Sequence, residues 1–254
     1  MQLPRNNFKH ALGAGERQIG LWSAMCSPMG TEIIGYSGFD WILLDMEHAP
    51  NELPEIVAQL QVLNASQSSA VVRSPWNDMV MIKRILDIGA QSIMFPYIQN
   101  ADEARRAVEY TRYPVRGIRG VAGGSRASGY GRVKDYLHKA SEEICVLVQV
   151  ETREAIEQLE NIAAVDGVNG IFVGPADLSA SMGHLGELNH EDVQAVIRGV
   201  AETLTRLGMP SGILAVDEDV ARRYIDWGYN FVAIGTDTGL LAKAADSLRE
   251  RFRN

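Results

Sequence analysis

Residues 145–177 read CVLVQVETREAIEQLENIAAVDGVNGIFVGPAD and contain one complete strand–helix–strand unit. The apolar run Cys145–Glu151 is followed by the amphipathic run Thr152–Ala164, and a second apolar run, Gly170–Val173, comes after it. Both apolar runs are nearly continuous rather than alternating, which is typical of strands covered on both faces of a parallel sheet. This unit therefore predicts an α/β fold with parallel strands.

The same alternation extends over the whole chain. Strand-like runs lie at Ile19–Ser23, Trp41–Glu47, Ala70–Arg73, Ser92–Ile98, Cys145–Glu151, Gly170–Val173, Gly212–Val216 and Phe231–Gly235. Helix-like runs lie at Asn51–Asn64, Asn77–Ile88, Thr152–Ala164, Glu191–Leu207, Asp217–Trp227 and Gly239–Phe252. Eight such units favour a single (β/α)8 TIM barrel over residues 1–254. The alternative is an open doubly wound sheet, but no GxGxxG motif follows the first strand to support it.

The composition narrows the possible classes of protein. The chain has 254 residues, 46% of them hydrophobic, and a formal net charge of -8, which makes it a poor candidate for binding nucleic acid or an anionic membrane. Cys26 and Cys145 have no CxxC spacing, which fits a reducing cytoplasm. The N-terminus lacks the apolar run of a secretory signal, and no stretch approaches the ~18 apolar residues of a transmembrane helix.

One segment interrupts the rhythm of strands and helices. Residues 113–132 read YPVRGIRGVAGGSRASGYGR, which is rich in Gly, Ser and Arg and too long for an ordinary connection. Its position between the fourth and fifth strands leads us to expect it on the active-site rim of the barrel. There Arg126 and Arg132 could meet a distal carboxylate of a substrate, or could simply be solvated.

Two carboxylates follow neighbouring strands of the expected barrel. Glu151 ends the fifth strand and Asp177 follows the sixth, 26 residues later, so both can face one point. Catalytic residues of such barrels lie at the carboxyl ends of the strands. Two carboxylates without a thiolate or clustered imidazoles suit a hard cation such as Mg²⁺ or Mn²⁺. The alternative is that these acids cap helices or pair with arginines.

Polar and charged groups at other strand ends complete a candidate site. Gly174-Pro175-Ala176-Asp177 should open a short helix, and because Pro175 has no N–H, Ala176 and Asp177 are the expected donors to a carboxylate or phosphate. A plain strand-to-helix turn is the alternative. Arg73 ends the third strand, where its guanidinium suits a developing enolate oxygen or a carboxylate. The alternative is an ion pair with Glu47 or Asp45.

His48 lies at the end of the second strand, three residues after Asp45. A carboxylate that holds an imidazole is a general acid–base arrangement, whereas the alternative is that His48 caps the next helix. No strand-like run contains a lysine, because the lysines are Lys9, Lys83, Lys134, Lys139 and Lys243. A Schiff-base aldolase needs a desolvated lysine inside its barrel, so that mechanism is excluded.

These motifs resemble the HpcH/HpaI aldolase family, the class II pyruvate aldolases, and within it the aldolases of 4-hydroxy-2-oxo acids and 2-keto-3-deoxy sugar acids. The resemblance is carried above all by FDWILLDMEHAPN (39–51), VVRSPWND (71–78), CVLVQVETREAIEQL (145–159) and GVNGIFVGPADLSASMG (167–183). It implies a metal-dependent lyase that reversibly cleaves a 4-hydroxy-2-oxo acid to pyruvate, or a close 2-oxo acid, and an aldehyde. The alternatives within the same superfamily are a CoA-ester lyase and a 2-oxo-acid decarboxylase.

The resemblance also implies roles for single residues. Glu151 and Asp177 correspond to the ligands of Mg²⁺, Mn²⁺ or Co²⁺, and Gln149 lies beside them. Arg73 corresponds to the group that polarises the C2 oxygen of pyruvate, and Asp45 with His48 to the acid–base dyad. The carboxylate cradle corresponds to Gly174, Pro175, Ala176 and Asp177.

The resemblance further concerns the second substrate and the assembly. Leu214 corresponds to a residue of the aldehyde pocket, and Asp87 to an aspartate that reaches the site of a neighbouring subunit. Members of the family are typically hexamers in which the last helix is exchanged between partners. This sequence departs from the pattern at AGGSRASGYGR (122–132) and at Thr236. Both departures touch the aldehyde side, and they leave the identity of the aldehyde open.

Overall fold

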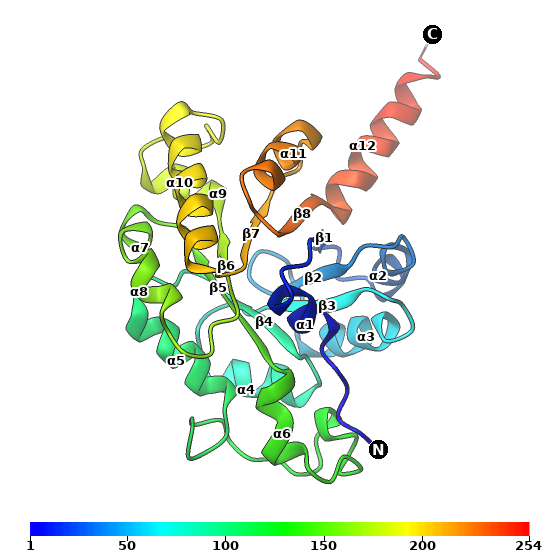
Figure 1. Cartoon of the computed structure of the whole chain (residues 1–254). Helices are drawn as coiled ribbons and strands as arrows, with labels where there is room; N and C mark the ends of the chain where they lie inside the picture. The colour runs from blue at the N-terminus through cyan, green and yellow to red at the C-terminus, as the bar shows by residue number, and fades with distance from the viewer. Residues whose placement is uncertain (254) are drawn as a thin grey trace.

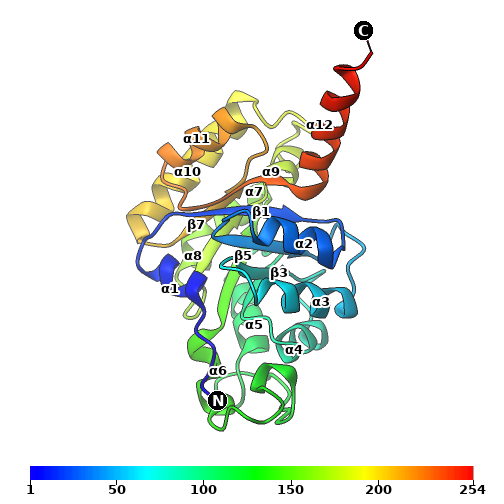
Figure 2. The ribbon, with the colours of Figure 1, turned by 90° about the vertical axis from the view of Figure 1, so that its right-hand side faces the viewer.

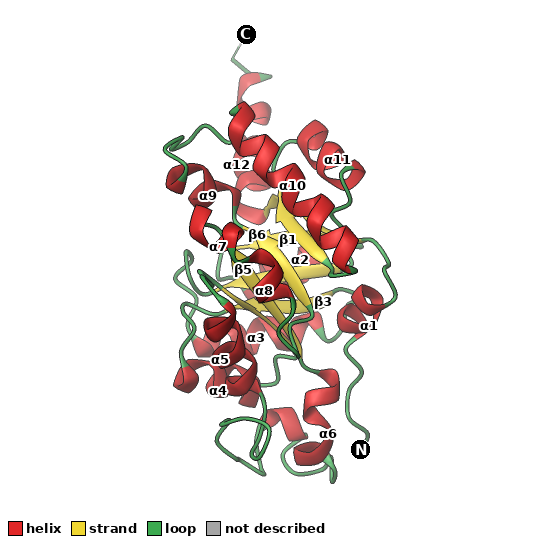
Figure 3. Ribbon diagram, turned by 60° about the vertical axis from the view of Figure 1, so that its left-hand side comes forward, coloured by secondary structure: helices red, strands yellow, loops and turns green. Residues whose placement is uncertain are grey.

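The computed structural model describes residues 1–253, and eight parallel strands in them close a barrel in chain order. The strands are β1 (Gln18–Ser23), β2 (Trp41–Asp45), β3 (Ser69–Arg73), β4 (Ser92–Phe95), β5 (Cys145–Val150), β6 (Gly170–Val173), β7 (Ser211–Leu214) and β8 (Phe231–Thr236). Figure 3 shows the strands at the centre of the molecule with helices around them. The predicted barrel and all eight predicted strands are confirmed.

Helices separate the strands, and most of them cover the outside of the barrel. They are α1 (Asn7–Gly13), α2 (Pro28–Gly35), α3 (Leu53–Leu63), α4 (Met79–Asp87), α5 (Ala101–Thr111), α6 (Tyr136–Glu143), α7 (Arg153–Glu157), α8 (Leu159–Ala163), α9 (Pro175–Ser181), α10 (Glu191–Leu207), α11 (Glu218–Asp226) and α12 (Asp237–Glu250), together with the 3-10 helix η1 (Arg126–Ser128). The predicted helix Thr152–Ala164 is therefore two short helices, because Gln158 leaves the helical conformation between α7 and α8.

Large side chains fill the inside of the barrel. Trp41, Phe172 and Phe231 are fully buried there, and Phe8 of α1 packs against Trp41 with 5.6 Å between the ring centroids. A Cβ on Gly20 would meet the Trp41 ring at 2.2 Å, so glycine is required at that point of β1. The interior is therefore a packed core closed at one end by α1, which leaves the carboxyl ends of the strands for a site.

Strand register brings the candidate residues together. Asp45 and Arg73 are direct neighbours across β2 and β3, and Val150 pairs with Val173 across β5 and β6. Glu151 and Gly174 follow those two paired residues, so they lie side by side at the carboxyl edge. The Gly174 N–H donates to the Val150 carbonyl at 3.3 Å and fixes this alignment.

The long segment 113–132 lies at the other end of the barrel from the expected one. It follows α5, and a connection from a helix to the next strand returns to the amino ends of the strands. The Arg126 Nη1 group donates to the carbonyl of Ile88, just beyond α4, at 2.6 Å. The segment lies near the N-terminus of the chain in Figures 1 and 2. The expectation that it borders the active site of its own subunit is therefore wrong.

The last helix extends away from the barrel. Figures 1 and 2 show α12 projecting beyond the other elements. Its apolar side chains are exposed, as shown by exposed fractions of 60% for Leu241 and 82% for Phe252 just after the helix. None of the helices in residues 1–253 has the length and apolar character needed to cross a membrane.

Candidate active site

A cavity of about 440 Å³ opens at the carboxyl ends of the strands. Ten of the residues singled out from the sequence line it, and they come from strands β2, β3, β5, β6 and β7 and from the residues that follow them. These residues are Asp45, His48, Arg73, Gln149, Glu151, Gly174, Pro175, Ala176, Asp177 and Leu214. Thr236, at the end of β8, also lines the cavity. The residues predicted at the strand ends therefore share one concave site.

Arg73 is held by two carboxylates at the floor of this cavity. Its Nε and Nη2 groups donate to Oδ1 and Oδ2 of Asp45 at 2.9 and 2.6 Å, a bidentate pair. Its Nη1 lies 2.7 Å from Oε2 of Glu47, an ion pair without hydrogen-bond geometry. The guanidinium also lies over the ring of Trp22, 4.8 Å from the ring centroid. Both ion pairs that the sequence left open are present, and they fix the plane of the guanidinium.

Asp45 is the partner that orients Arg73. It is 2% exposed and also accepts hydrogen bonds from Trp22 Nε1 at 3.1 Å and from the backbone N–H groups of Glu47 and His48 at 2.9 and 3.3 Å. Burial alone would raise the pKa of this carboxyl, but the hydrogen bonds and charge of Arg73 lower it. Asp45 is therefore an ionised anchor.

The predicted contact between the Asp45 carboxylate and the His48 imidazole is not formed within residues 1–253. From His48, the carboxylate accepts the backbone N–H and not the imidazole. Its oxygens already accept hydrogen bonds from the Arg73 guanidinium and the Trp22 indole. The His48 side chain is exposed and lines the cavity. Its imidazole is therefore accessible to a substrate without being held by Asp45.

Glu151 is the buried carboxylate of the site, with an exposed fraction of 3%. Its Oε1 accepts the backbone N–H of Tyr97 at 2.7 Å, and its Oε2 accepts Nε2 of Gln149 at 3.2 Å. Burial raises the pKa of Glu151 to about 7, and the nearby charges of Glu47 and Asp177 act in the same direction. Several acids therefore converge here with too little positive charge to balance them.

A divalent cation fits this donor set. Glu151 and Asp177 supply carboxylate oxygens, and the Oε1 atom of Gln149 is a buried acceptor without a hydrogen-bond partner in the described part of the chain. A Cβ on Gly174 would meet Oε2 of Glu151 at 2.1 Å, so the absence of a side chain there leaves room for the carboxylate. An all-oxygen set of this kind suits a hard cation such as Mg²⁺ or Mn²⁺.

Several contributors were not predicted from the sequence. Trp22 could have been predicted, because it lies near the carboxyl end of β1, and the predicted site residues lie at the same end of other strands. Tyr97 contributes through its backbone N–H and adopts a φ of 56°, which no sequence pattern indicates for a tyrosine. Leu188 and Asn189 line the cavity from the connection between α9 and α10, far from any strand end.

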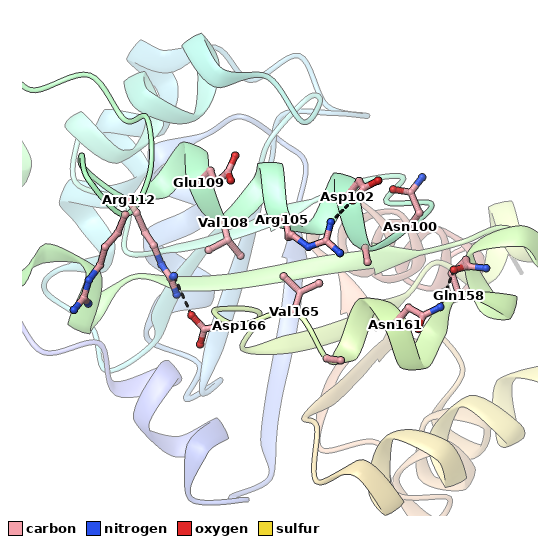
Figure 4. A pocket seen from close by; sticks show the side chains of 13 residues that line it. Asn100, Asp102, Arg105, Val108, Glu109, Arg112, Gln158, Asn161, Val165 and Asp166 are labelled. Atoms are coloured by element: carbon pink, nitrogen blue, oxygen red, sulfur yellow. Dashed lines mark hydrogen bonds and ion pairs between the residues drawn. The ribbon is translucent and has the colours of Figure 1, made fainter.

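Asp87 lies outside the cavity. It ends α4 and accepts a hydrogen bond from Nη2 of Arg119 at 2.7 Å. A larger hollow of about 710 Å³ lies between α5 and α8 on the outer layer of helices, and Figure 4 shows its polar lining. There Arg112 pairs with Asp166 at 3.1 Å and Arg105 with Asp102. Because this hollow lies apart from the carboxyl ends of the strands, the candidate active site is the smaller cavity.

Comparison with known proteins identifies relatives of this chain. The HpcH/HpaI aldolase/citrate lyase family matches residues 18–244. The chain is 52% identical to a 4-hydroxy-2-oxo-heptane-1,7-dioate aldolase of Klebsiella pneumoniae over 97% of this chain and 94% of that protein. It is 49% identical to a 5-keto-4-deoxy-D-glucarate aldolase of an Enterobacter species over 98% and 97% of the two chains.

Two solved structures are similar to this chain. An HpcH/HpaI aldolase/citrate lyase family protein from Burkholderia cenocepacia superposes with a TM-score of 0.95 at 39% identity, over 98% of this chain and all of the other. A citrate lyase beta subunit from M. tuberculosis, complexed with oxaloacetate and magnesium, matches at a TM-score of 0.58 and 17% identity over 89% and 93% of the chains. At that identity the second likeness concerns the fold alone.

Proposed function

The chain belongs to the HpcH/HpaI aldolase/citrate lyase family, and we propose that it cleaves 4-hydroxy-2-oxo acids reversibly to pyruvate and an aldehyde with the help of a divalent cation. It is an aldolase, a carbon–carbon lyase, as its curated relatives are named. The observation that carries the proposal is the convergence of Arg73, His48 and the pair Glu151 and Asp177 on one cavity at the strand ends.

Arg73 is the group that stabilises the charge of the reaction. When the C3–C4 bond of the substrate breaks, its electron pair forms the C2–C3 double bond of an enolate and leaves negative charge on the C2 oxygen. A guanidinium held rigidly by Asp45 and Glu47 is organised before the charge develops, which is the condition for a large effect. Because the C3 hydrogens of pyruvate are weakly acidic, unassisted formation of this enolate near neutral pH is slow.

His48 is the proton carrier of the proposed reaction. It takes the proton of the C4 hydroxyl as the C4 carbonyl of the aldehyde forms, and return of that proton from the imidazole to C3 of the enolate completes pyruvate and restores the base. Its exposed imidazole on the rim of the cavity has the freedom to approach that hydroxyl. In the synthetic direction the same imidazole returns the proton to the new alkoxide.

Glu151 and Asp177 would hold the cation, with Gln149 beside them. When bound, Mg²⁺ or Mn²⁺, or Co²⁺, would supply Lewis-acid polarisation of the C2 carbonyl. Ala176 and Asp177, in the first turn of α9, present backbone N–H groups that suit the substrate carboxylate. Pro175 begins that turn, and the missing side chain of Gly174 leaves room for the Glu151 carboxylate.

The aldehyde would occupy the part of the cavity lined by Leu214, Val216 and Thr236. This part combines apolar surface with one hydroxyl, and it suits a short aldehyde with some oxygen substituents. Pyruvate release is measured from 4-hydroxy-2-oxoheptanedioate and 5-keto-4-deoxyglucarate, with malyl-CoA and free 2-oxo acids as comparison substrates. Release from the first two supports the proposal. Cleavage of malyl-CoA alone, or loss of CO₂ alone, would replace it by the corresponding lyase or decarboxylase.

The domain organisation, the oligomeric state and the cellular compartment of the enzyme are also part of the proposal. We propose one catalytic domain over the whole chain, a hexamer in which α12 packs on a neighbouring subunit, and Asp87 directed at a neighbour's cavity. The exposed apolar residues of α12 support the exchange. Both cysteines are free, which supports a reducing cytoplasm.

A further inference from the structure

Two histidines of the connection between α9 and α10 lie close to Asp192, which is in the first turn of α10, and all three residues are outside the lining of the cavity. The Nε2 atom of His184 lies 3.6 Å from Oδ2 of Asp192, and the Nδ1 atom of His190 lies 3.8 Å from the same oxygen. The three donor atoms all lie within 4.8 Å of one another. We propose that His184, His190 and Asp192 form a second cation site, separate from the pair Glu151 and Asp177.

Two of the three donor separations are close to those of a tetrahedral ion. With metal–ligand bonds of about 2.0–2.1 Å, two ligand atoms of a tetrahedral site lie roughly 3.3 Å apart. The two measured separations from Oδ2 of Asp192 exceed this value by only a few tenths of an ångström, which small side-chain rotations can close. Three protein ligands leave one position for water.

The backbone fixes the two histidines in this arrangement. The His184 N–H donates to the Ser179 carbonyl at 2.8 Å, and the His190 N–H donates to the Glu187 carbonyl at 2.9 Å. The imidazole rings stack with 3.6 Å between centroids and an interplanar angle of 18°, and because an ion lies in the plane of each ring that binds it, one ring has to turn for both to bind the same ion. Ion binding therefore requires a side-chain rotation but little further ordering of the backbone.

The contacts of the two rings show what ion binding would change. Nδ1 of His190 is unprotonated, because it accepts the backbone N–H of Asp192 at 3.3 Å, and this long hydrogen bond has to be given up for the same lone pair to bind an ion. Oε2 of Glu187 lies 4.0 Å from Nδ1 of His184, the ring nitrogen that would not bind the ion. A carboxylate beside the second nitrogen of a ligating histidine is the usual means of orienting such a ligand.

The donor types set the kind of cation. Two imidazoles and one carboxylate suit a borderline ion such as Zn²⁺, whereas Mg²⁺ prefers oxygen alone. Leu188 and Asn189 lie between the two histidines in the sequence and line the cavity. An ion held by His184, His190 and Asp192 therefore braces this wall of the cavity. The inference stands on these residues and does not depend on the reaction proposed above.

The test is Zn²⁺ binding by the full-length protein after chelator treatment, measured by calorimetry with Mg²⁺ in large excess. Wild type should bind one Zn²⁺ per chain, and H184A and H190A should weaken that binding more than about a hundredfold, since even loss of an orienting partner typically costs 10–100-fold. E187Q should weaken it about tenfold. D177N and H138A, which alters an exposed histidine of α6, should bind Zn²⁺ as wild type does.

The visible absorption of bound Co²⁺ is a second test, which does not depend on the folding of the alanine variants. Co²⁺ in a tetrahedral site absorbs visible light intensely, whereas Co²⁺ in a six-coordinate oxygen site absorbs weakly. Wild type and D177N should give the intense spectrum, and D192N should not. Zn²⁺ binding that survives in H184A and H190A, or an intense Co²⁺ spectrum that D177N removes and D192N retains, would overturn the inference.

Discussion

Replacing Asp45 by Asn tests whether this carboxylate orients the guanidinium of Arg73 or acts on the imidazole of His48. Oδ2 of Asp45 accepts from both Nη2 of Arg73 and Nε1 of Trp22, and Oδ1 accepts from Nε of Arg73 and two backbone N–H groups. An amide nitrogen in place of Oδ2 would face two donors, and an amide carries no charge to balance the guanidinium. Arg73 should therefore lose its fixed orientation although the side-chain volume is unchanged.

The expected loss of stability follows from the burial of the pair. Both side chains are almost fully buried, so solvent does little to screen the interaction. Removing one partner of a buried pair typically costs 3–5 kcal/mol, and because Glu47 remains as a second counter-charge we expect about 3 kcal/mol for D45N. With the proposed role of the oriented guanidinium as an oxyanion donor, kcat should fall by about 10²–10³, as it should for R73A.

The assay is pyruvate release coupled to NADH oxidation across a range of pH, together with urea unfolding. D45N should lower kcat at every pH without moving the pH profile, because Asp45 acts on Arg73 rather than on the imidazole of His48. D40N is the matched control, since Asp40 accepts a backbone N–H from Ile19 at an exposed point before β2. A D45N enzyme with a shifted profile and a normal plateau, or with near-normal kcat and stability, would refute the reasoning.

Three further predictions address other parts of the structure. G174A should weaken Mg²⁺ binding at least tenfold with the fold retained by circular dichroism, because the new Cβ would occupy the place of the Glu151 carboxylate; unchanged affinity in calorimetry would contradict this. Burial raises the pKa of Glu143, but hydrogen bonds from Asn6 and His10 lower it below its usual 4.5, so its stabilisation is present above about pH 4.5 and is lost as the pH falls through the lowered pKa. Near pH 7 the free energy of unfolding of E143Q should therefore be about 1 kcal/mol lower than that of wild type, and in strong acid the two should be equal. A difference that persists in acid would argue against this role of Glu143. Deleting α12 should convert the assembly to smaller species in sedimentation, whereas an unchanged mass would exclude its proposed exchange.

The barrel could be predicted because its signal is strong at every strand. Strands buried on both faces read as continuous apolar runs, as Trp41–Asp45 and Gly170–Val173 do. Helix α5 was not predicted because its buried face consists mainly of small residues such as Ala104 and Ala107, which give a weak hydrophobic period. Without α5, the segment 113–132 was placed at the wrong end of the barrel.

The membership of the site could be predicted better than its internal contacts. Arg73, Glu151 and Asp177 could be identified because carboxyl ends of parallel strands share one edge. A spacing of three residues suggested that Asp45 holds His48, but the register of β2 and β3 places Arg73 directly beside Asp45, and the guanidinium takes the carboxylate. Pairing across strands is a tertiary property that a local spacing does not report.

The most direct test of the central claim is pyruvate release from a 4-hydroxy-2-oxo acid before and after EDTA treatment, with Mg²⁺ or Mn²⁺ added back. Release should disappear with EDTA, return with either ion in wild type and in H184A, and stay absent in E151Q. Release that EDTA does not affect, or full recovery in E151Q, would contradict the roles assigned to Glu151 and Asp177 and with them the metal-dependent aldolase.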